Sequence, residues 1–396
     1  MKKIKLNFLA GVEYQGKVYA SSREINGLFQ LDIITHDLVY LKRFSKEKAG
    51  FGLHRKAYLY KNEAWFIPGM SQYITVVNLD TLEMDSFKIP SNGKERKAIS
   101  KIKVVYYSGG IIEDRYLYLV PTNIDALLLI DLKTKKFYPY YDVAKPDECL
   151  TYGTYVDGNI YLFPYVGNDV IKINLKTKAT QRYSCKWPNG IYANFVYVSN
   201  KFWIIPRCAG YILKTDLDFQ HIERYFVKDC FDEGYMYQEI FVENGMLFVL
   251  PFSSNRILKF NINNGQLSQI YLKEEWLNNG KTGMLRLFSE DKTILISNRK
   301  NLLFLYDYDR DFLQEIELNI EREVLLEEFC KKDGTLNLEE FCYDGCYNEN
   351  YLGLVRFVGI TSDQSEQRKN KCRDIGKTTW NALKTGDMVG IGENKN

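Results

Sequence analysis

Apolar and polar residues follow one another in a pattern that recurs along most of the chain, and its clearest copy runs from Asn159 to Thr177. It consists of an apolar strand ending in proline, a short loop, a second apolar strand, and a turn. An Asp or Asn closes each second strand. The whole pattern occurs in seven copies, which follow one another at intervals of roughly 42 to 53 residues. These closing residues are Asp32, Asn78, Asp131, Asn174, Asp216, Asn261 and Asp307. At a constant spacing before them stand Ser22, Pro68, Pro121, Pro164, Pro206, Pro251 and Ser297.

Both strands of each copy are apolar at consecutive positions, which predicts strands buried on both faces. The first strand carries Tyr19, Trp65, Tyr118, Tyr161, Trp203, Phe248 and Ile294 in equivalent places, and the second carries Leu28, Ile74, Leu127, Val170, Ile212, Ile257 and Leu303. The closing Asp or Asn is typical of a turn in which its side-chain oxygen accepts backbone N–H groups further on.

Another strand precedes each copy and a short strand follows it, so that each unit has four antiparallel strands. Seven such units with no helix between them predict an all-β fold, a seven-bladed β-propeller over residues 1–318. A two-sheet sandwich is the alternative, but it requires no repeated motif. Antiparallel pairing puts the prolines and the long connections between units on one face of the ring, where ligands usually bind a rigid scaffold.

The pattern stops at Asn319, and residues 319–396 form a C-terminal extension. Apolar residues three and four apart predict short helices over 322–331 and 336–341, and Asp374 is placed to cap a third. A strand is expected over 351–360 and a polar linker over 361–371. We expect this mainly helical tail to pack on the propeller, since its aromatic residues need cover; a lid over the loop-rich face is the alternative.

Composition narrows the class of protein. The chain has 396 residues, a net charge of +3 and eight cysteines. It has no run of about 18 apolar residues that could cross a bilayer, and Lys5, Asn7 and Glu13 interrupt what would be an export signal. We therefore expect a cytoplasmic protein with reduced thiols and no membrane contact. The weak net charge argues against nucleic acid as a partner.

The strand-loop-strand unit, as in Val170 to Thr177, resembles the repeat of bacterial propellers of the YVTN, NHL and quinoprotein-like kind. The resemblance covers roughly residues 5–318. It implies the fold and no particular activity, because such propellers include enzymes, sensors and scaffolds. The Gly-His and Trp-Asp signature of WD40 repeats, the Kelch residues, the sialidase box and the tryptophan-docking repeat of quinoproteins are absent. No family's catalytic residues can therefore be placed on this chain.

Few residues suit metal or acid–base chemistry. His36 and His221 fall on the short-turn face, whereas His54 enters the second blade from the opposite face, so the three histidines should not converge. Each is expected to be a surface or structural residue. We expect no cofactor and no metal; the weak alternative is a zinc site made of Cys330, Cys342, Cys346 and Cys372.

Charged and aromatic residues on the loop-rich face are the best candidates for binding. Basic residues gather on the first, second and seventh blades, and acidic residues such as Glu148 lie across the ring. A basic half-rim favours phosphate, uronate or an acidic protein segment, and tyrosine or tryptophan there can stack on sugar or peptide groups. The candidate ligand-binding residues are Arg23, His54, Arg55, Tyr165, Tyr192, Arg207, Tyr237, Trp276 and Arg299.

Three functions remain open. The favoured one is a non-catalytic interaction module whose loop-rich face and channel mouth hold a protein segment, an anionic small molecule or a glycan. The alternative is a carbohydrate-active or lyase-like enzyme using Arg207, Tyr237, Glu239 and Arg286 for acid–base and charge-stabilising roles. Nucleic-acid binding through the basic run from Lys94 to Lys103 is the least favoured.

Overall fold

The computed structural model describes most of the chain between Lys2 and Ile320. The described residues are 2–4, 8–23, 25–47, 52–69, 71–89, 107–122, 126–140, 143, 145, 148–166, 169–185, 192–206, 210–227, 237–277, 283–289, 293–297 and 302–320. The predicted helices, strand and linker of the tail lie outside the described residues.

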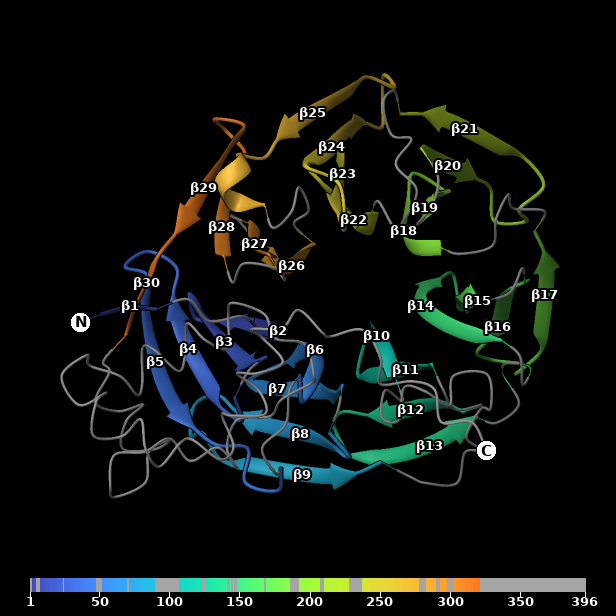
Figure 1. Ribbon diagram of the computed structural model, residues 1–396. Coiled ribbons are helices and arrows are strands. Elements are labelled where there is room, and N and C mark those ends of the chain that lie inside the picture. Colours follow the sequence, from blue (N-terminus) through green and yellow to red (C-terminus); the bar gives the residue numbers. More distant parts are fainter. Residues whose placement is uncertain are drawn as a thin grey trace, which may run out of the picture.

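Seven four-stranded antiparallel blades form a ring, as predicted (Figure 1). The innermost strands are β2 (Phe8–Tyr14), β6 (His54–Tyr60), β10 (Tyr107–Glu113), β14 (Cys149–Val156), β18 (Tyr192–Val198), β22 (Tyr237–Glu243) and β26 (Met284–Ser289). The second strands are β3 (Lys17–Ser22), β7 (Glu63–Pro68), β11 (Tyr116–Pro121), β15 (Asn159–Val166), β19 (Lys201–Pro206), β23 (Met246–Pro251) and β27 (Thr293–Ser297). The third strands are β4 (Leu28–Asp32), β8 (Tyr73–Asn78), β12 (Leu127–Asp131), β16 (Asp169–Asn174), β20 (Tyr211–Thr215), β24 (Arg256–Asn261) and β28 (Leu302–Asp307). The outermost strands are β5 (Asp37–Lys42), β9 (Met84–Lys88), β13 (Lys136–Tyr140), β17 (Thr180–Ser184), β21 (Ile222–Phe226), β25 (Leu267–Tyr271) and β29 (Phe312–Ile316).

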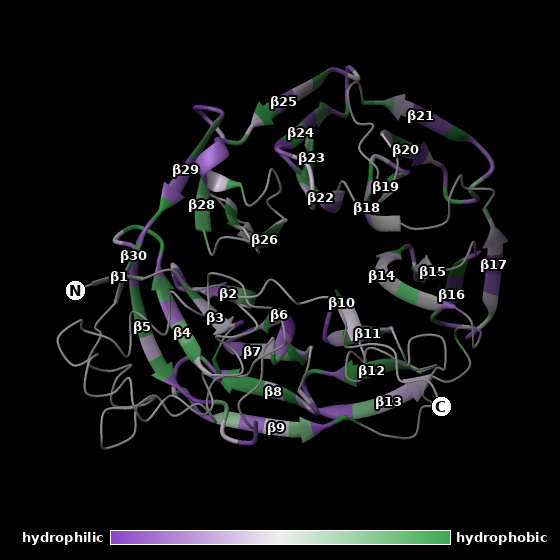
Figure 2. Ribbon diagram, in the orientation of Figure 1, coloured by the Kyte–Doolittle hydropathy of each residue, from purple (hydrophilic) through white to green (hydrophobic). Residues whose placement is uncertain are grey.

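The middle strands of each blade are buried because neighbouring blades cover both of their faces. The aromatic column of the second strands is buried throughout, with Trp65 and Ile294 fully enclosed. The third strands β8 and β28 are largely green in Figure 2, whereas the outer strands β17 and β29 carry more polar residues. Where an Asp or Asn closes a third strand, its oxygen accepts backbone N–H groups as expected, for example from Ile34 and Thr35 to Asp32 Oδ1 at 2.8 and 3.0 Å.

The innermost strands crowd together near the axis of the ring. Each contacts the innermost strand of the next blade, and β26 contacts β2, so that the ring is closed. Glycine permits close packing at two positions of these strands. A Cβ on Gly110 would lie 2.7 Å from Leu117 Cδ1, and one on Gly153 would lie 2.7 Å from Ile111 Cδ1. Those separations are shorter than carbon atoms tolerate.

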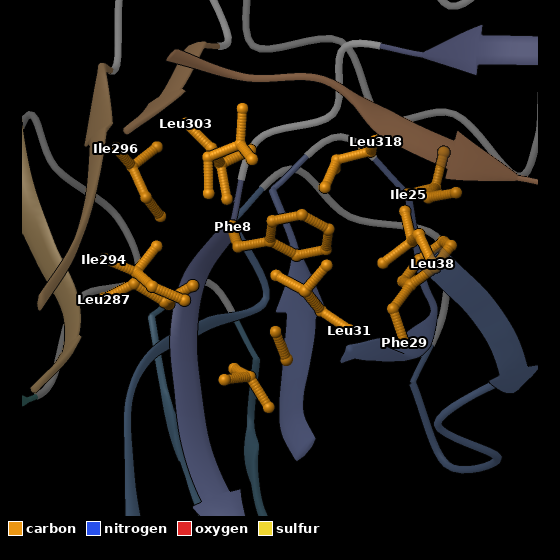
Figure 3. Close-up of a cluster of buried hydrophobic side chains, with 13 residues drawn as sticks. Phe8, Ile25, Phe29, Leu31, Leu38, Leu287, Ile294, Ile296, Leu303 and Leu318 are labelled. Atoms are coloured by element: carbon orange, nitrogen blue, oxygen red, sulfur yellow. The ribbon is translucent and has the colours of Figure 1, made fainter. Parts of the chain in front are cut away.

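Two short strands that the sequence did not predict close the ring on its outer side. β30 (Leu318–Ile320) leaves the seventh blade and pairs in parallel with β5, and β1 (Lys2–Ile4) pairs antiparallel with β30. The first blade therefore has six strands, in the order β1-β30-β5-β4-β3-β2. Figure 3 shows side chains of both blades in one apolar cluster, with Phe8 between Ile294 of the seventh blade and Leu38 of the first.

The described residues contain one helical segment, the 3-10 turn η2 (Glu274–Trp276) between the sixth and seventh blades. No helix in the described part of the chain combines the length and apolar character needed to span a bilayer.

Candidate functional site

The loop face is defined here as the side of the ring on which the second strands end and the innermost strands begin. A β-bulge recurs just inside this face. In each of the first six blades, one residue of the innermost strand pairs with the second strand at or next to the proline or serine column. The register of the innermost strand shifts directly after this residue, for example between His54 and Lys56 and between Tyr237 and Glu239. A bulge adds one residue and changes which face the following side chains occupy. Residues before and after it therefore have different surroundings.

Residues before the bulge are buried between blades. This column includes Phe8, His54, Tyr107, Leu150, Tyr237 and Met284, each with 2% or less of its surface exposed. Two predicted ligand-binding residues, His54 and Tyr237, thus belong to the apolar core. Tyr237 packs with Trp203 and Leu247 between the fifth and sixth blades.

His54 is held as a neutral structural residue. Its Nδ1 is 2.9 Å from Ser21 Oγ, and its ring packs edge-on against Phe44 at 4.4 Å and next to Phe66 at 5.4 Å. Burial lowers the pKa of His54 to about 3, because the charged imidazolium would have to leave water. The other histidines lie elsewhere. His36 is in the turn after β4, and His221 is bonded to Asp216 on an exposed turn at 2.9 Å.

Residues after the bulge meet at the axis of the ring. The strands β6 and β22 lie on opposite sides of the centre in Figure 1. Lys56 belongs to β6 and Glu239 to β22, and Lys56 Nζ lies 3.4 Å from Glu239 Oε1. The Glu239 side chain is 6% exposed and the Lys56 side chain 31%. This ion pair joins the second and sixth blades across the ring. We call Lys56, Gln238, Glu239 and Arg286 the axial cluster.

The rest of the axial cluster fastens the sixth blade to the seventh. Glu239 Oε2 accepts a hydrogen bond from the backbone N–H of Arg286 at 2.7 Å, and the Gln238 side chain donates to the carbonyl of Met284. Both bonds satisfy backbone groups on the free edge of β26, which has no strand on its axial side. The Arg286 guanidinium lies over the Phe241 ring at 4.6 Å. Tyr58 caps the edge of β10 in the same way, bonding both N–H and C=O of Gly110.

This arrangement favours holding an anion over proton transfer. Both oxygens of Glu239 are engaged, one by Lys56 and one by the Arg286 backbone, so the carboxylate is held in place by donors of the protein itself. Lys56 keeps donors that Glu239 does not use, because an ammonium has three N–H groups. Among the described residues, no three His, Cys, Asp or Glu side chains are grouped as metal ligands.

The remaining predicted residues fall in three groups. Arg55 is exposed at the bulge of β6, and half-buried Arg23 accepts a hydrogen bond at its carbonyl from Gly52 N–H at 2.7 Å. Trp276 is 5% exposed and donates its indole N–H to Glu315 Oε2 at 2.8 Å, as a core residue would. Tyr165 and Tyr192 lie in β15 and β18, but their side chains are outside the described part. Arg207 and Arg299, together with Cys330, Cys342, Cys346 and Cys372, also lie outside the described residues.

The one described member of the expected acidic rim is neutralised. Glu148 is 6% exposed and pairs with Arg182 at 2.6 Å and with Lys145 at 3.8 Å. Asp169 joins the same network, with Lys145 at 3.2 Å and Arg182 at 3.6 Å. Among the described residues of this corner, two cations therefore balance two carboxylates.

The sequence pattern gives no reason to single out Lys56, Gln238 or Phe241. The sequence does contain one indication that His54 and Tyr237 are buried. Phe8, Tyr107 and Leu150 stand at the same spacing before the proline or serine column as His54 and Tyr237 do, so the column reads as apolar core. Nothing in the repeat pairs Lys56 with Glu239, because the contact joins two different blades.

Comparisons with known proteins show the fold without a family. No family model matches the chain, and no curated protein matches it. A catalytically inactive histidine-to-alanine variant of virginiamycin B lyase from Staphylococcus aureus, solved with quinupristin, superposes with a TM-score of 0.57 and 11% identity. That match covers 75% of this chain and 95% of the lyase. YCF48 bound to the D1 peptide superposes with a TM-score of 0.51 and 8% identity, covering 78% of this chain and 86% of YCF48. At such identities the likeness concerns the propeller fold alone.

Proposed function

We propose that this protein is a non-catalytic interaction module that holds a segment of another protein on its loop face, next to the axial cluster. The observation that carries this proposal is the engagement of Glu239, both oxygens of which are bound within the protein. Within the described residues, Lys56 has no carboxylate partner other than Glu239, and the Arg286 guanidinium lies over the Phe241 ring without a carboxylate partner. The site therefore offers hydrogen-bond donors and positive charge on a rigid scaffold. YCF48, whose fold is similar, is a propeller with a bound peptide.

An enzyme of the lyase or carbohydrate-active kind has less support. The similar lyase is inactive when one histidine becomes alanine. In this chain the three histidines are placed apart, with His54 buried under Phe44 and His221 on an exposed outer turn. Tyr237, expected to assist such chemistry, is 2% exposed.

The test is a map of contacts in native cells. A photo-crosslinking residue, benzoylphenylalanine, replaces Arg55 on the loop face in one variant of the full chain and Lys176 in an exposed turn on the opposite face in another. Irradiation should give a discrete protein adduct through position 55 and none of the same size through position 176. An adduct confined to position 176, or none at either position, would contradict a protein partner on the loop face.

A further inference from the structure

The axial cluster carries an excess of positive charge that its own carboxylate does not balance. Lys56, Arg286 and the neighbouring Arg55 contribute three cations, and Glu239 contributes one negative charge. Among the described residues, no carboxylate lies within ion-pair distance of the Arg55 or Arg286 guanidinium. Surface charges are usually solvated by water, but Lys56 Nζ lies 3.4 Å from the buried Glu239 carboxylate, and the backbone N–H of Arg286 binds the other oxygen of the same carboxylate. Both cationic residues are therefore neighbours of one buried carboxylate.

Glu239 shows which kind of anion the site accepts. Its carboxylate lies in reach of Lys56 Nζ at 3.4 Å, longer than the usual charge-assisted bond of about 2.7–2.9 Å. Lys56 is thus held toward a carboxylate that does not saturate it. The other oxygen of Glu239 accepts the Arg286 backbone N–H at 2.7 Å, so this carboxylate is shared between two donors. A second carboxylate arriving from the loop face would find Lys56 already directed toward the axis.

Arg286 is arranged to complete such a site. Its guanidinium carbon lies over the Phe241 ring, 4.6 Å from the ring centroid, and this cation–π contact favours that position of the group. A guanidinium stacked in this way keeps the N–H groups on its edge available, and two of them match the two oxygens of a carboxylate. Because this contact already restricts the Arg286 side chain, less conformational entropy is lost when a ligand binds, which favours affinity.

We infer that the axial cluster binds the acidic side chain of an aspartate- or glutamate-containing protein segment, through Lys56 and Arg286 with Arg55 at the rim, and that Glu239 weakens this binding. The inference rests on the proposed interaction function and names the chemistry of the partner. A free phosphate presents similar oxygens, so the experiment separates the two.

The test uses the full chain and a fluorescein-labelled twelve-residue peptide of alternating Glu and Ala, followed by fluorescence anisotropy. A peptide with Gln in place of Glu serves as the neutral probe. We expect the Glu peptide to bind and the Gln peptide to bind at least about tenfold more weakly, since hydrogen bonds to charged groups are worth that much. Arg286→Gln and Lys56→Gln should each weaken binding of the Glu peptide about tenfold.

Two further variants separate binding from folding. Glu239→Gln keeps an oxygen to accept the Arg286 N–H but removes the negative charge, so affinity for the Glu peptide should rise up to about fivefold. Lys88→Gln removes an exposed cation at the outer edge of the same face and should leave affinity within about twofold. A general loss of folded protein cannot weaken binding in two variants and strengthen it in the third.

Three outcomes would overturn the inference. The first is an equal fall in affinity in Lys88→Gln and Arg286→Gln, which indicates only non-specific charge attraction. The second is an unchanged or lower affinity in Glu239→Gln. The third is displacement of the peptide by millimolar inorganic phosphate with the same response to the variants, which indicates a free phosphate site. If any of these results is found together with a protein adduct through position 55, the proposed interaction function stands. Only the inference that the partner binds through an acidic side chain is then rejected.

Discussion

Single side chains in this ring owe their state to the blade next to them, and His54 shows this most directly. Its imidazole is 1% exposed, and burial holds its pKa at about 3. In the unfolded chain a histidine titrates near its ordinary value of about 6.5. Between these two pH values the unfolded chain binds a proton at His54 and the folded protein does not. The contribution of His54 to the free energy of unfolding therefore falls as the pH drops below about 6.5 and is constant above it.

The first prediction follows from this difference. Between pH 7.5 and 5.5, His54 should remove about 1.4 kcal/mol from the free energy of unfolding. His54→Gln should lose that share of the pH dependence, as measured by urea unfolding at both pH values. Ser21→Ala keeps the histidine while removing its 2.9 Å partner, and should keep the pH dependence. Equal pH dependence in the wild type and His54→Gln would show that the imidazole is not held neutral.

A second prediction concerns the crowding at the axis. A methyl group at Gly110 would lie 2.7 Å from Leu117 Cδ1 and 3.2 Å from the carbonyl oxygen of Tyr118, and backbone does not yield easily. Gly110→Ala should therefore cost about 1–3 kcal/mol in the free energy of unfolding. Gly109→Ala is the matched control, because its methyl group meets only Tyr58 Oη at 3.6 Å. It should stay within about 0.5 kcal/mol of the wild type in the same urea titrations.

Residue environments were the least predictable part of the site, and the bulge is the reason. The sequence places His54 and Glu239 correctly on innermost strands, yet a single extra residue per strand decides that His54 faces the core and that Lys56 and Glu239 reach the axis. A bulge has no strong residue signature in these strands. The direction of the side chains near the bulge can be predicted only by aligning the seven innermost strands and comparing the residues at equivalent positions.

At the scale of the element, the second and third strands were predictable because each position is repeated seven times in the same surroundings. One feature of these strands was not anticipated. In the fourth, fifth and sixth blades a lysine on the third strand lies over the ring opposite it, with Lys172 over Tyr161, Lys214 over Trp203 and Lys259 over Phe248 at 5.5, 5.5 and 5.9 Å. These are directly opposed cross-strand pairs, in which an ammonium can rest on the aromatic face while its stem covers the core.

The third prediction concerns η2, the 3-10 turn that carries Trp276. Its indole packs against Phe304 at 4.8 Å and donates to Glu315, so it pins the sixth blade to the seventh. Trp276→Phe should lose about 1–2 kcal/mol with the hydrogen bond, and Trp276→Ala about 3–5 kcal/mol, by thermal or urea unfolding. If Trp276→Ala leaves stability within about 0.5 kcal/mol of the wild type, Trp276 is a surface residue free to contact a ligand.

At the scale of the whole molecule, the number of blades follows from the repeat, but the closure of the ring does not. Within a blade, the same pattern specifies each strand pair. β1 and β30 belong to no repeat, and they are so short that no periodicity marks them. Their pairing with β5 depends on which chain ends meet after the ring has formed.

The last prediction tests that closure. Leu318 on β30 is 1% exposed and packs in the cluster that joins the seventh blade to the first, as Figure 3 shows. Leu318→Ala should cost about 2–4 kcal/mol, as other buried leucines do, and the loss should be local at first. Hydrogen exchange should rise in β2 to β5 and β26 to β29 before it rises in the fourth and fifth blades, because subglobal opening begins where the ring is joined.

The matched control is Leu213→Ala, which removes the same atoms from a fully buried position between the fourth and fifth blades. Its exchange should rise in those blades and leave the junction between the seventh and first blades protected. If both variants give the same exchange pattern, the ring opens as one cooperative unit, and β30 is no weaker a junction than any other contact between blades.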